Sequence, residues 1–465
     1  MRVWEDDPGA GQPVERPVPK LPTGNMQFAI DAPAPPPALY ERHTPEFRYW
    51  ATVDALKRGV SFWSALLPKG TTWQRGPTLD VRVDAGDKLN ALYNRASLAF
   101  FHATVEGKAI YTAESPDVVC HEMGHAVLDA IRPQLWDAMS HEVAAFHESF
   151  GDMSAILSAL QVRTLREQVF EETGGLYRNS RLSRVAEQLG WAVGRRQPCA
   201  VDADALRNAV NCFFYRPAAQ LPPVAPSCAL SSAAHSYSRV FTGAFFESFA
   251  GMVITQGRPT TPDFLKQAGL DWAKLLVAAV LAAPIEPSYM AQVAIHMLQA
   301  DKELFNGKYA PALENGFLRK GILTASSAAA ASRATPPRGR AAAVARAAAA
   351  SSAELPALTL DGAEFGLGDR PVVVRAAAET PRLAAAASAL DGSPVTPQSS
   401  AGAARAFLSE VVLRDHLFRP DRHGSDDAPD ERLRTHVLVE DGDALVVERR
   451  LFEAGPCLRH GRYAH

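Results

Sequence analysis

The chain has 465 residues, of which 47% are hydrophobic and 21% charged, and its formal net charge is −3. This balance is typical of a globular protein, and it excludes a largely disordered chain and the charge excess of a nucleic-acid-binding protein. No apolar run approaches the roughly 18–20 residues of a membrane span, and five cysteines in so long a chain do not make a disulfide scaffold. The first residues lack a basic start followed by an apolar run, so we expect no secretory signal and a cytoplasmic protein, with export by another route as the alternative.

The predicted elements begin with a Pro-rich arm over residues 1–40, which we expect to be extended, with little to bury. Residues 41–115 are predicted to form a β-rich lobe. Apolar and polar residues alternate over 79–84, which indicates a half-buried strand. The Glu-Gly pair at 106–107 lies between two apolar runs and predicts a hairpin.

Residues 116–323 are predicted to form a mostly helical lobe. Ser115 is a good N-cap and Pro116 suits the first helical position, so a helix should begin here and end before Pro133. Apolar spacing predicts further helices over 141–160, from 235 onward, over 275–280 and over 289–304.

The remaining chain divides in two. Residues 324–355 are predicted to be a solvated linker, because they are nearly all Ala, Ser, Pro and Arg; binding of an anionic partner by the arginines is the less favoured alternative. Residues 356–465 are predicted to form a separate α+β unit, with strands at 371–375, 435–440 and 444–448. The expected fold class is therefore α+β.

The sequence His-Glu-Met-Gly-His at 121–125 carries the chemistry. His121 and His125 are four residues apart, so both imidazoles project from one side of a helix and can converge on one ion. Zinc accepts such a pair together with a carboxylate and keeps a fourth position for water. Glu122 lies beside that position, where it can take a proton from the water. The alternative is a helix with two ordinary histidines.

The third ligand decides the class of site. Leu128 and Ile131 stand where an extended His-Glu-x-x-His-x-x-Gly-x-x-His motif needs Gly and His, so that form is excluded. Downstream, Glu148 and Asp152 are four apart on one side of a predicted helix. One carboxylate can bind the ion, and the other can accept the outer N–H of a ligand histidine.

These blocks resemble the thermolysin-like zinc metallopeptidases, of the glutamate-zincin group. The matching residues are 117–127, followed by Glu148 and Asp152. The resemblance implies a zincin-like catalytic region made of a β-rich lobe with an edge strand and a mostly helical lobe. It also implies these roles: zinc ligation by His121, His125 and Glu148, general base catalysis by Glu122, and orientation of His121 by Asp152.

Four more residues have roles implied by the same resemblance. Ala99, within residues 98–101, would lie on the edge strand that pairs with an extended peptide substrate. His235 would stabilise the tetrahedral oxyanion, and Arg207 would bind a substrate carbonyl. Trp136 stands where the family has a tyrosine that is a second oxyanion donor. The family's calcium-binding clusters are not evident, so the sequence gives no support for calcium.

Other possible ligands are expected to lie outside the centre. His147 and Glu142 face other sides of the predicted helix than Glu148, and with His141 we expect surface or outer-shell positions. Cys120 is expected to be a packed thiol. A polar group in the C-terminal unit has no defined ligand spacing and is expected not to bind metal: His416, His423, Asp426 and Asp427.

The sequence therefore predicts a zinc metalloendopeptidase that acts on a peptide or protein, with no nucleic-acid or membrane partner. Two alternatives remain open. One is a zinc-binding scaffold that works through partners, which Trp136 and the added C-terminal unit favour. The other is a zinc amidohydrolase that acts on non-protein amides.

Overall fold

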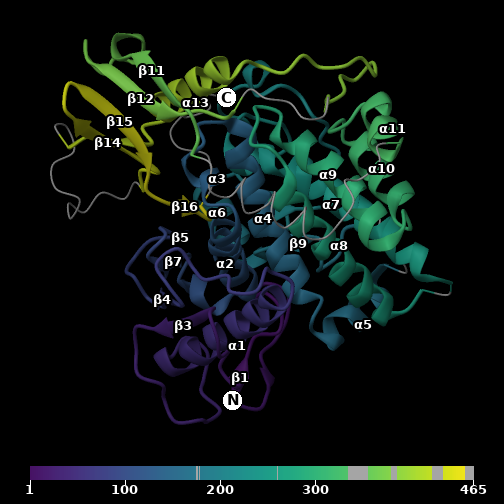
Figure 1. Ribbon diagram of the computed structural model, residues 1–465. Coiled ribbons are helices and arrows are strands. Elements are labelled where there is room, and N and C mark those ends of the chain that lie inside the picture. The colour runs from purple at the N-terminus through teal and green to yellow at the C-terminus, as the bar shows by residue number, and fades with distance from the viewer. Residues whose placement is uncertain are drawn as a thin grey trace.

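A computed structural model describes residues 1–173, 176, 178–258, 260–333, 354–378, 385–420 and 433–455. The fold is mixed α+β, as expected. Figure 1 shows the N-terminal strands at the bottom, the helices in the middle and at the right, and the C-terminal unit at the upper left. Within the described residues, no helix combines the length and apolar character that a membrane crossing requires.

The N-terminal sheet has five strands in the order β16-β5-β6-β4-β3. Strands β3, β4 and β6 run parallel to one another, whereas β5 is antiparallel to β6 and β16 is antiparallel to β5. The bounds are β3 Gln27–Ile30, β4 Thr78–Arg82, β5 Ala91–Tyr93, β6 Ser97–Phe100 and β16 Phe452–Glu453. The strand predicted over 79–84 is β4, and the last strand comes from the far end of the chain.

The prediction of an edge strand at 98–101 is wrong. Strand β6 pairs with β4 on one side and with β5 on the other, so its backbone is not open to a peptide. Ala99 is buried in an apolar cluster with Leu92 and Leu451. A strand inside a sheet that is covered on both faces has the same continuous apolar sequence as a hydrophobic edge strand, and the sequence alone does not separate the two.

The N-terminal arm and the β-rich lobe contain more regular, buried secondary structure than the sequence predicted. Strands β1 (Arg2–Val3) and β2 (Val14–Glu15) pair with each other, and Val3 packs against helix α1 (Pro45–Ser64). The arm is therefore anchored at its start, and the β-rich lobe contains a 20-residue helix. The hairpin predicted around 106–107 is present as β7 (His102–Val105) and β8 (Lys108–Tyr111).

The helical lobe contains the helices predicted from the apolar spacing. Those that carry the site are α2 (Pro116–Ile131), α4 (His141–Ala159) and α7 (Ala234–Gln256). The others are α3 Gln134–Asp137, α5 Arg163–Thr173, α6 Glu187–Arg196, α8 Pro262–Ala282, α9 Tyr289–Phe305, α10 Ala310–Arg319 and α11 Ala325–Arg333, with short strands β9 Arg184–Val185 and β10 Arg207–Asn208. Helix α11 covers the start of the predicted linker, whose residues 334–353 lie outside the described part of the chain.

Helices α2 and α4 approach closely because glycines lie at their contact. A methyl group on Gly124 would come within 2.6 Å of Ser154 Oγ and 3.0 Å of the Gly151 Cα. A methyl group on Gly151 would lie 2.6–2.9 Å from three ring atoms of His121. Real Cβ atoms essentially never come so close, so both positions require glycine. This contact fixes the distance between the histidines of α2 and the acidic side of α4.

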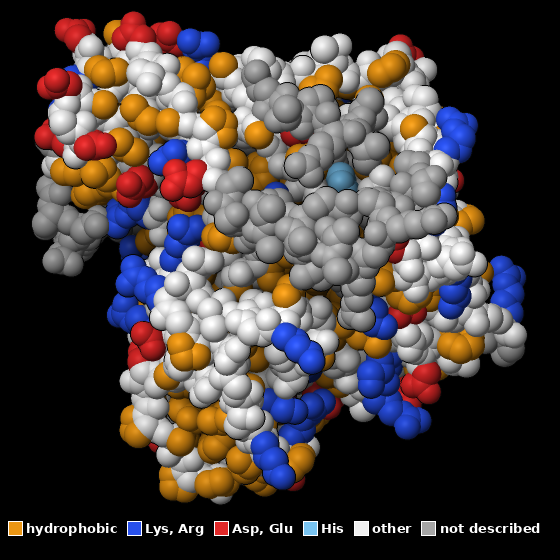
Figure 2. All heavy atoms as spheres, viewed as in Figure 1, with side chains coloured by type: hydrophobic (Ala, Val, Ile, Leu, Met, Phe, Trp, Pro, Cys, Tyr) orange, Lys and Arg blue, Asp and Glu red, His pale blue; other side chains and the backbone are white. Residues whose placement is uncertain are grey.

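The C-terminal unit is a second sheet, in the order β11-β12-β15-β14-β13, with helix α13 packed on it. Its bounds are β11 Ala357–Asp361, β12 Pro371–Arg375, α13 Ser400–Leu413, β13 Leu417–Phe418, β14 His436–Asp441 and β15 Ala444–Arg449. The three strands predicted here are β12, β14 and β15. Figure 2, in the same view, shows acidic and hydrophobic side chains on the face of this unit at the upper left. It is not fully separate, because β16 leaves it to join the N-terminal sheet. His423, Asp426 and Asp427 lie outside the described residues.

We expect Gly151→Ala to destabilise the protein. Alanine is ordinarily the better helix former by about 1 kcal/mol, but here its methyl group would displace the His121 ring, and such overpacking costs about 1–3 kcal/mol. Urea unfolding of the purified variant measures the change. The matched control is Gly194→Ala in α6, where the nearest atom is Val201 Cγ2 at 3.3 Å, and its stability should stay level or rise. Equal stability changes in the two variants would contradict the close-contact argument.

Candidate metal centre

The centre begins on α2. Ser115 caps the helix, since its Oγ accepts a hydrogen bond from Val118 N at 3.2 Å, and Pro116 occupies the first turn. His121 and His125 then project one turn apart, with ring centroids 4.8 Å apart and planes at 90°. With Glu122 they form a buried group whose possible ligand atoms lie within 4.8 Å of one another. The His-Glu-x-x-His sequence is thus placed for metal binding.

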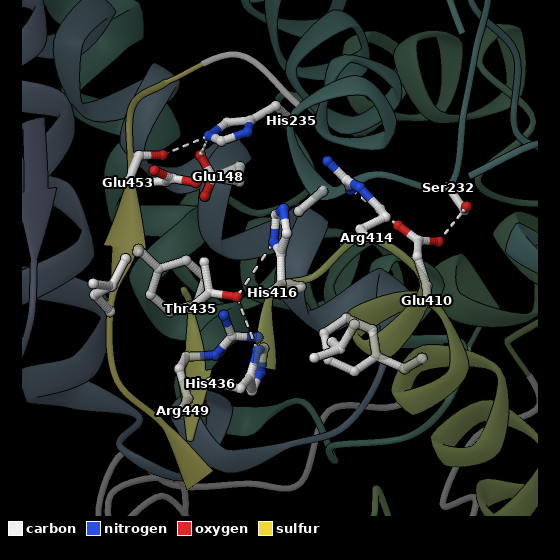
Figure 3. A pocket seen from close by; sticks show the side chains of 16 residues that line it. Glu148, Ser232, His235, Glu410, Arg414, His416, Thr435, His436, Arg449 and Glu453 are labelled. Atoms are coloured by element: carbon white, nitrogen blue, oxygen red, sulfur yellow. Dashed lines mark hydrogen bonds and ion pairs between the residues drawn. The ribbon is translucent and has the colours of Figure 1, made fainter. Parts of the chain in front are cut away.

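Helix α4 brings Glu148 to the same point. Its Oε2 lies 3.3 Å from His121 Nε2 and 3.9 Å from His125 Nε2. His235, in the first turn of α7, places its Nε2 3.0 Å from the same oxygen. Figure 3 shows His235 directed at Glu148. One carboxylate oxygen therefore lies among three imidazoles that come from two other helices.

Several buried polar atoms of this group lack a protein partner. The Nε2 atoms of His121 and His125, and both carboxylate oxygens of Glu122, have no hydrogen-bond partner among the described residues. Buried polar atoms are nearly always satisfied, because leaving one unpaired costs free energy. A cation between the imidazoles and a water beside Glu122 would satisfy them. Two imidazoles and a carboxylate are a donor set that zinc accepts, so the residues fit the ion.

The protonation of the group follows from burial and from its neighbours. Burial raises the pKa of Glu122 to about 8. For His121, burial opposes the charged form, but the neighbouring carboxylates of Asp152 and Glu148 outweigh it and raise the pKa to about 9. Burial lowers the pKa of His125 to about 3. The two imidazoles differ because only His121 has a carboxylate on its outer nitrogen.

Asp152 contacts the outer ring nitrogen of His121, and Arg207 in turn binds Asp152. Asp152 Oδ1 lies 3.0 Å from His121 Nδ1. The Arg207 guanidinium holds both Asp152 oxygens, with Nε at 3.1 and 3.0 Å and Nη2 at 2.7 Å. Burial would raise the pKa of Asp152, but the positive charge of Arg207 outweighs it and holds the pKa at about 2. Arg207 was expected to bind a substrate carbonyl; the structure places it on Asp152, and the substrate role stays a prediction.

His147 contacts the outer ring nitrogen of His125, the second histidine of the motif. Its Nδ1 lies 2.9 Å from His125 Nδ1, so one of these nitrogens donates to the other. Burial lowers the pKa of His147 well below its usual value, so the ring is neutral and able to accept. The sequence predicted a surface or outer-shell position for His147 but not this contact with His125. Because α4 crosses α2 closely, one side of α4 brings Asp152 to His121 and another side brings His147 to His125.

The other residues weighed as ligands do not join the group. His141 Nε2 lies 2.9 Å from Glu410 Oε2 on α13. Glu142 accepts hydrogen bonds from the Tyr215 hydroxyl and the Met290 N–H. Cys120 is buried, as expected of a packed thiol. Each of these groups has a structural partner elsewhere in the fold.

Trp136, expected as an oxyanion donor, has its indole N–H engaged within the chain, and a role toward substrate stays a prediction. Its indole N–H donates to the Arg449 carbonyl at 3.1 Å. Its ring meets Tyr93 and Phe452 edge to face, at centroid distances of 5.6 and 5.4 Å. The single indole donor is therefore engaged by the C-terminal part of the chain.

A second buried acidic group lies at the N-terminal side of α2. Carboxylate oxygens of Asp7, Asp117 and Glu187 lie within 4.8 Å of one another. Burial and the neighbouring carboxylates raise the pKa of Asp117 well above its usual value, and raise that of Glu187 to about 10. Sequence analysis did not predict this group, because Asp7 belongs to the arm that we expected to be extended.

Comparison with known proteins adds one structural likeness. No protein-family model matches the chain, and no curated protein sequence matches it. The chain is similar to the solved structure of the precursor of protealysin, a metalloproteinase from Serratia proteamaculans, with a TM-score of 0.42 and 16% sequence identity over 65% of this chain and 90% of that one. At this level of similarity, the assignment of the centre rests on its own geometry.

We expect His147→Ala to weaken metal binding about 10- to 100-fold, because the partner that orients His125 is lost. Competition with a chelating dye measures the affinity. His296→Ala is the control, since that histidine lies on α9 and its Nδ1 faces Gln292 O of the same helix. An unchanged affinity in His147→Ala would show that His125 needs no such partner.

We expect Asp117→Asn to stabilise the metal-free protein at pH 8 by about 1 kcal/mol or more. The pKa values of Asp117 and Glu187 are raised on folding, so the folded state holds protons that the unfolded chain has released, and stability falls as pH rises above about 4. The variant removes one of these charges and keeps an acceptor for the Ala186 N–H.

Unfolding in denaturant at pH 5 and pH 8 tests this pH dependence, with the exposed Asp80→Asn as control. The gap between Asp117→Asn and the unaltered chain should widen as pH rises. A gap that is constant with pH would mean that the cluster carries no excess protons.

Proposed function

We propose that the protein is a zinc-dependent peptidase, with His121, His125 and Glu148 as the metal ligands. One observation carries the proposal: the buried Nε2 atoms of His121 and His125, which have no hydrogen-bond partner among the described residues, both lie near one Glu148 oxygen, at 3.3 and 3.9 Å. A protein that folded around these atoms without an ion would leave them unsatisfied at a cost in free energy.

The remaining residues of the centre fit hydrolysis of an amide. Zinc, when bound, polarises a carbonyl and lowers the pKa of its water to about 7. Glu122 would take the proton of the attacking water and pass it to the leaving nitrogen, since its carboxylate lies beside the two histidines and has no hydrogen-bond partner among the described residues. His235 would donate to the carbonyl oxygen as negative charge develops on it.

Outer contacts would keep the ligands in place. Asp152, held by Arg207, accepts from the outer nitrogen of His121, and His147 contacts the outer nitrogen of His125. Partners of this kind fix the tautomer and the ring orientation of a metal-ligating histidine. They leave Nε2 of both rings for the ion.

A zinc-binding scaffold without turnover is the second candidate. Engagement of the Trp136 N–H by Arg449 favours it, since that donor is then missing from the reaction. Against it stands Glu122, whose two buried oxygens have no hydrogen-bond partner among the described residues. A structural zinc site has no use for such a carboxylate, so hydrolysis is the better account.

The test pairs Glu122→Gln with Glu148→Ala. Glu122→Gln should keep one zinc per chain and lose peptide cleavage about 10²- to 10⁴-fold, because the proton acceptor is removed. Glu148→Ala should lose zinc, because a ligand is removed. Elemental analysis and digestion of a peptide library, with and without chelator, give the two readouts. Full zinc in Glu148→Ala would refute the ligand assignment, and full cleavage by Glu122→Gln would refute the general base.

A further inference from the structure

The last described residues of the chain form part of the N-terminal sheet. Strand β16 runs antiparallel to β5, with Phe452 opposite Tyr93 and Glu453 opposite Leu92. The next residue extends the pairing, since Ala454 N donates to Ala91 O at 3.0 Å. An extended peptide binds to a sheet edge by this same main-chain pairing. The edge of β5 is therefore occupied by a segment of the same chain, in the way that a sheet edge takes an extended peptide.

This segment lies on the metal centre. The Phe452 ring stacks on His125 at 4.8 Å and 18°, and on His147 at 4.0 Å and 20°. The Glu453 carbonyl accepts from His235 Nε2 at 2.6 Å. Figure 3 shows His235 between the Glu453 carbonyl and Glu148. A peptide carbonyl thus occupies the position that the proposed function gives to a substrate.

Side chains of the cleft hold the segment on both sides of Phe452. Trp136 Nε1 donates to Arg449 O at 3.1 Å, and Arg449 Nε donates back to Trp136 O at 3.0 Å. The Arg449 guanidinium also lies 4.2 Å over the Phe452 ring. Beyond Phe452, Asn90 Nδ2 donates to the Glu453 carboxylate at 2.7 Å. Backbone, ring and carboxylate are each recognised, as in a bound ligand.

The segment closes the centre. His121, Glu122, His125 and Glu148 are each at most 2% exposed. A cavity lined by Glu148, His235 and Glu453 has a volume of about 60 Å³, whereas ligand pockets usually measure about 300–1,000 Å³. A peptide substrate has no path to these residues while β16 stays on β5.

We propose that residues 449–455 are a resident peptide ligand of the metal cleft and that they keep the full-length chain latent until they leave β5. The latency rests on the proposed peptidase function; the binding of the segment does not. The residues of the segment also indicate the class of peptide that the cleft takes: an extended chain, antiparallel to β5, with an aromatic residue followed by an acidic one.

The first experiment measures hydrolysis of a fluorogenic peptide library by the zinc-loaded full-length chain and by Phe452→Ala. The variant should raise kcat/KM at least tenfold, because the ring that covers His125 and His147 is lost. Leu413→Ala is the matched control, since Leu413 is 72% exposed on α13, and it should match the unaltered chain. Equal rates for Phe452→Ala and the unaltered chain would overturn the latency.

A second variant, Glu453→Ala, tests the latency if Phe452→Ala does not fold. Glu453→Ala loses the contact with Asn90 but keeps the backbone pairing with β5, so hydrolysis should rise by a smaller factor, about threefold. No rise in this folded variant would count against the latency in the same way.

The second experiment needs no turnover. A fluorescein-labelled, acetylated and amidated peptide with the sequence of residues 449–455 is titrated, by anisotropy, into zinc-loaded Glu122→Gln and into Glu122→Gln/Phe452→Ala. The doubly altered chain should bind at least tenfold more tightly, and a peptide with Ala in place of Phe should bind it at least tenfold more weakly.

The two experiments separate the two proposals. If no variant hydrolyses peptide but the difference in binding is found, the peptidase function fails and the resident ligand stands. If peptide is hydrolysed but both chains bind the labelled peptide equally, the resident ligand is refuted and the peptidase function stands.

Discussion

The metal centre depends on the close crossing of α2 and α4. Gly124 and Gly151 leave no room for a side chain at the contact, so the helices approach until the Gly151 Cα lies against the His121 ring. The histidines of one helix then meet the carboxylate of the other at 3.3 and 3.9 Å. Interiors are packed too densely to tolerate an added methyl group here without displacement. The arrangement of the site thus depends on glycine at these two positions, where no side chain keeps the helices apart.

Around this crossing, each histidine of the motif has a different outer partner. His121 faces Asp152, which Arg207 holds ionised, whereas His125 faces the neutral ring of His147. The carboxylate on its outer nitrogen stabilises charge on His121, whereas burial without such an outer partner suppresses charge on His125. Both arrangements leave Nε2 directed at the same place. The pair is therefore oriented by its surroundings as much as by its spacing on the helix.

The C-terminal unit connects this centre to the rest of the chain. Its strand β16 joins the N-terminal sheet, and its Glu410 lies 2.9 Å from His141 on α4. Its Arg449 and Trp136 of α3 each donate a hydrogen bond to the other's carbonyl. A unit that looks independent in sequence is thus bound to the site by strand pairing and by buried polar contacts. Access to the centre therefore depends on whether this unit stays docked.

Much of the helical lobe could be predicted from sequence. Capping by Ser115, proline at the first turn and the apolar spacing gave α2, and the four-residue separations gave the shared sides of His121 with His125 and of Glu148 with Asp152. These features are local, so helix geometry alone determines them. Strand pairing is not local, and for that reason the edge strand was misplaced at 98–101 when β6 lies inside the sheet.

The sequence by itself determined the types and the spacing of the candidate ligands and the presence of a candidate general base. Only the tertiary structure decided that His147 stands behind His125, that Asp7 from the arm reaches Asp117, and that Phe452 covers the centre. Each of these contacts joins residues more than 20 positions apart, and Phe452 lies more than 300 positions from His125. No local pattern encodes such contacts, because they depend on how whole helices and sheets pack against one another.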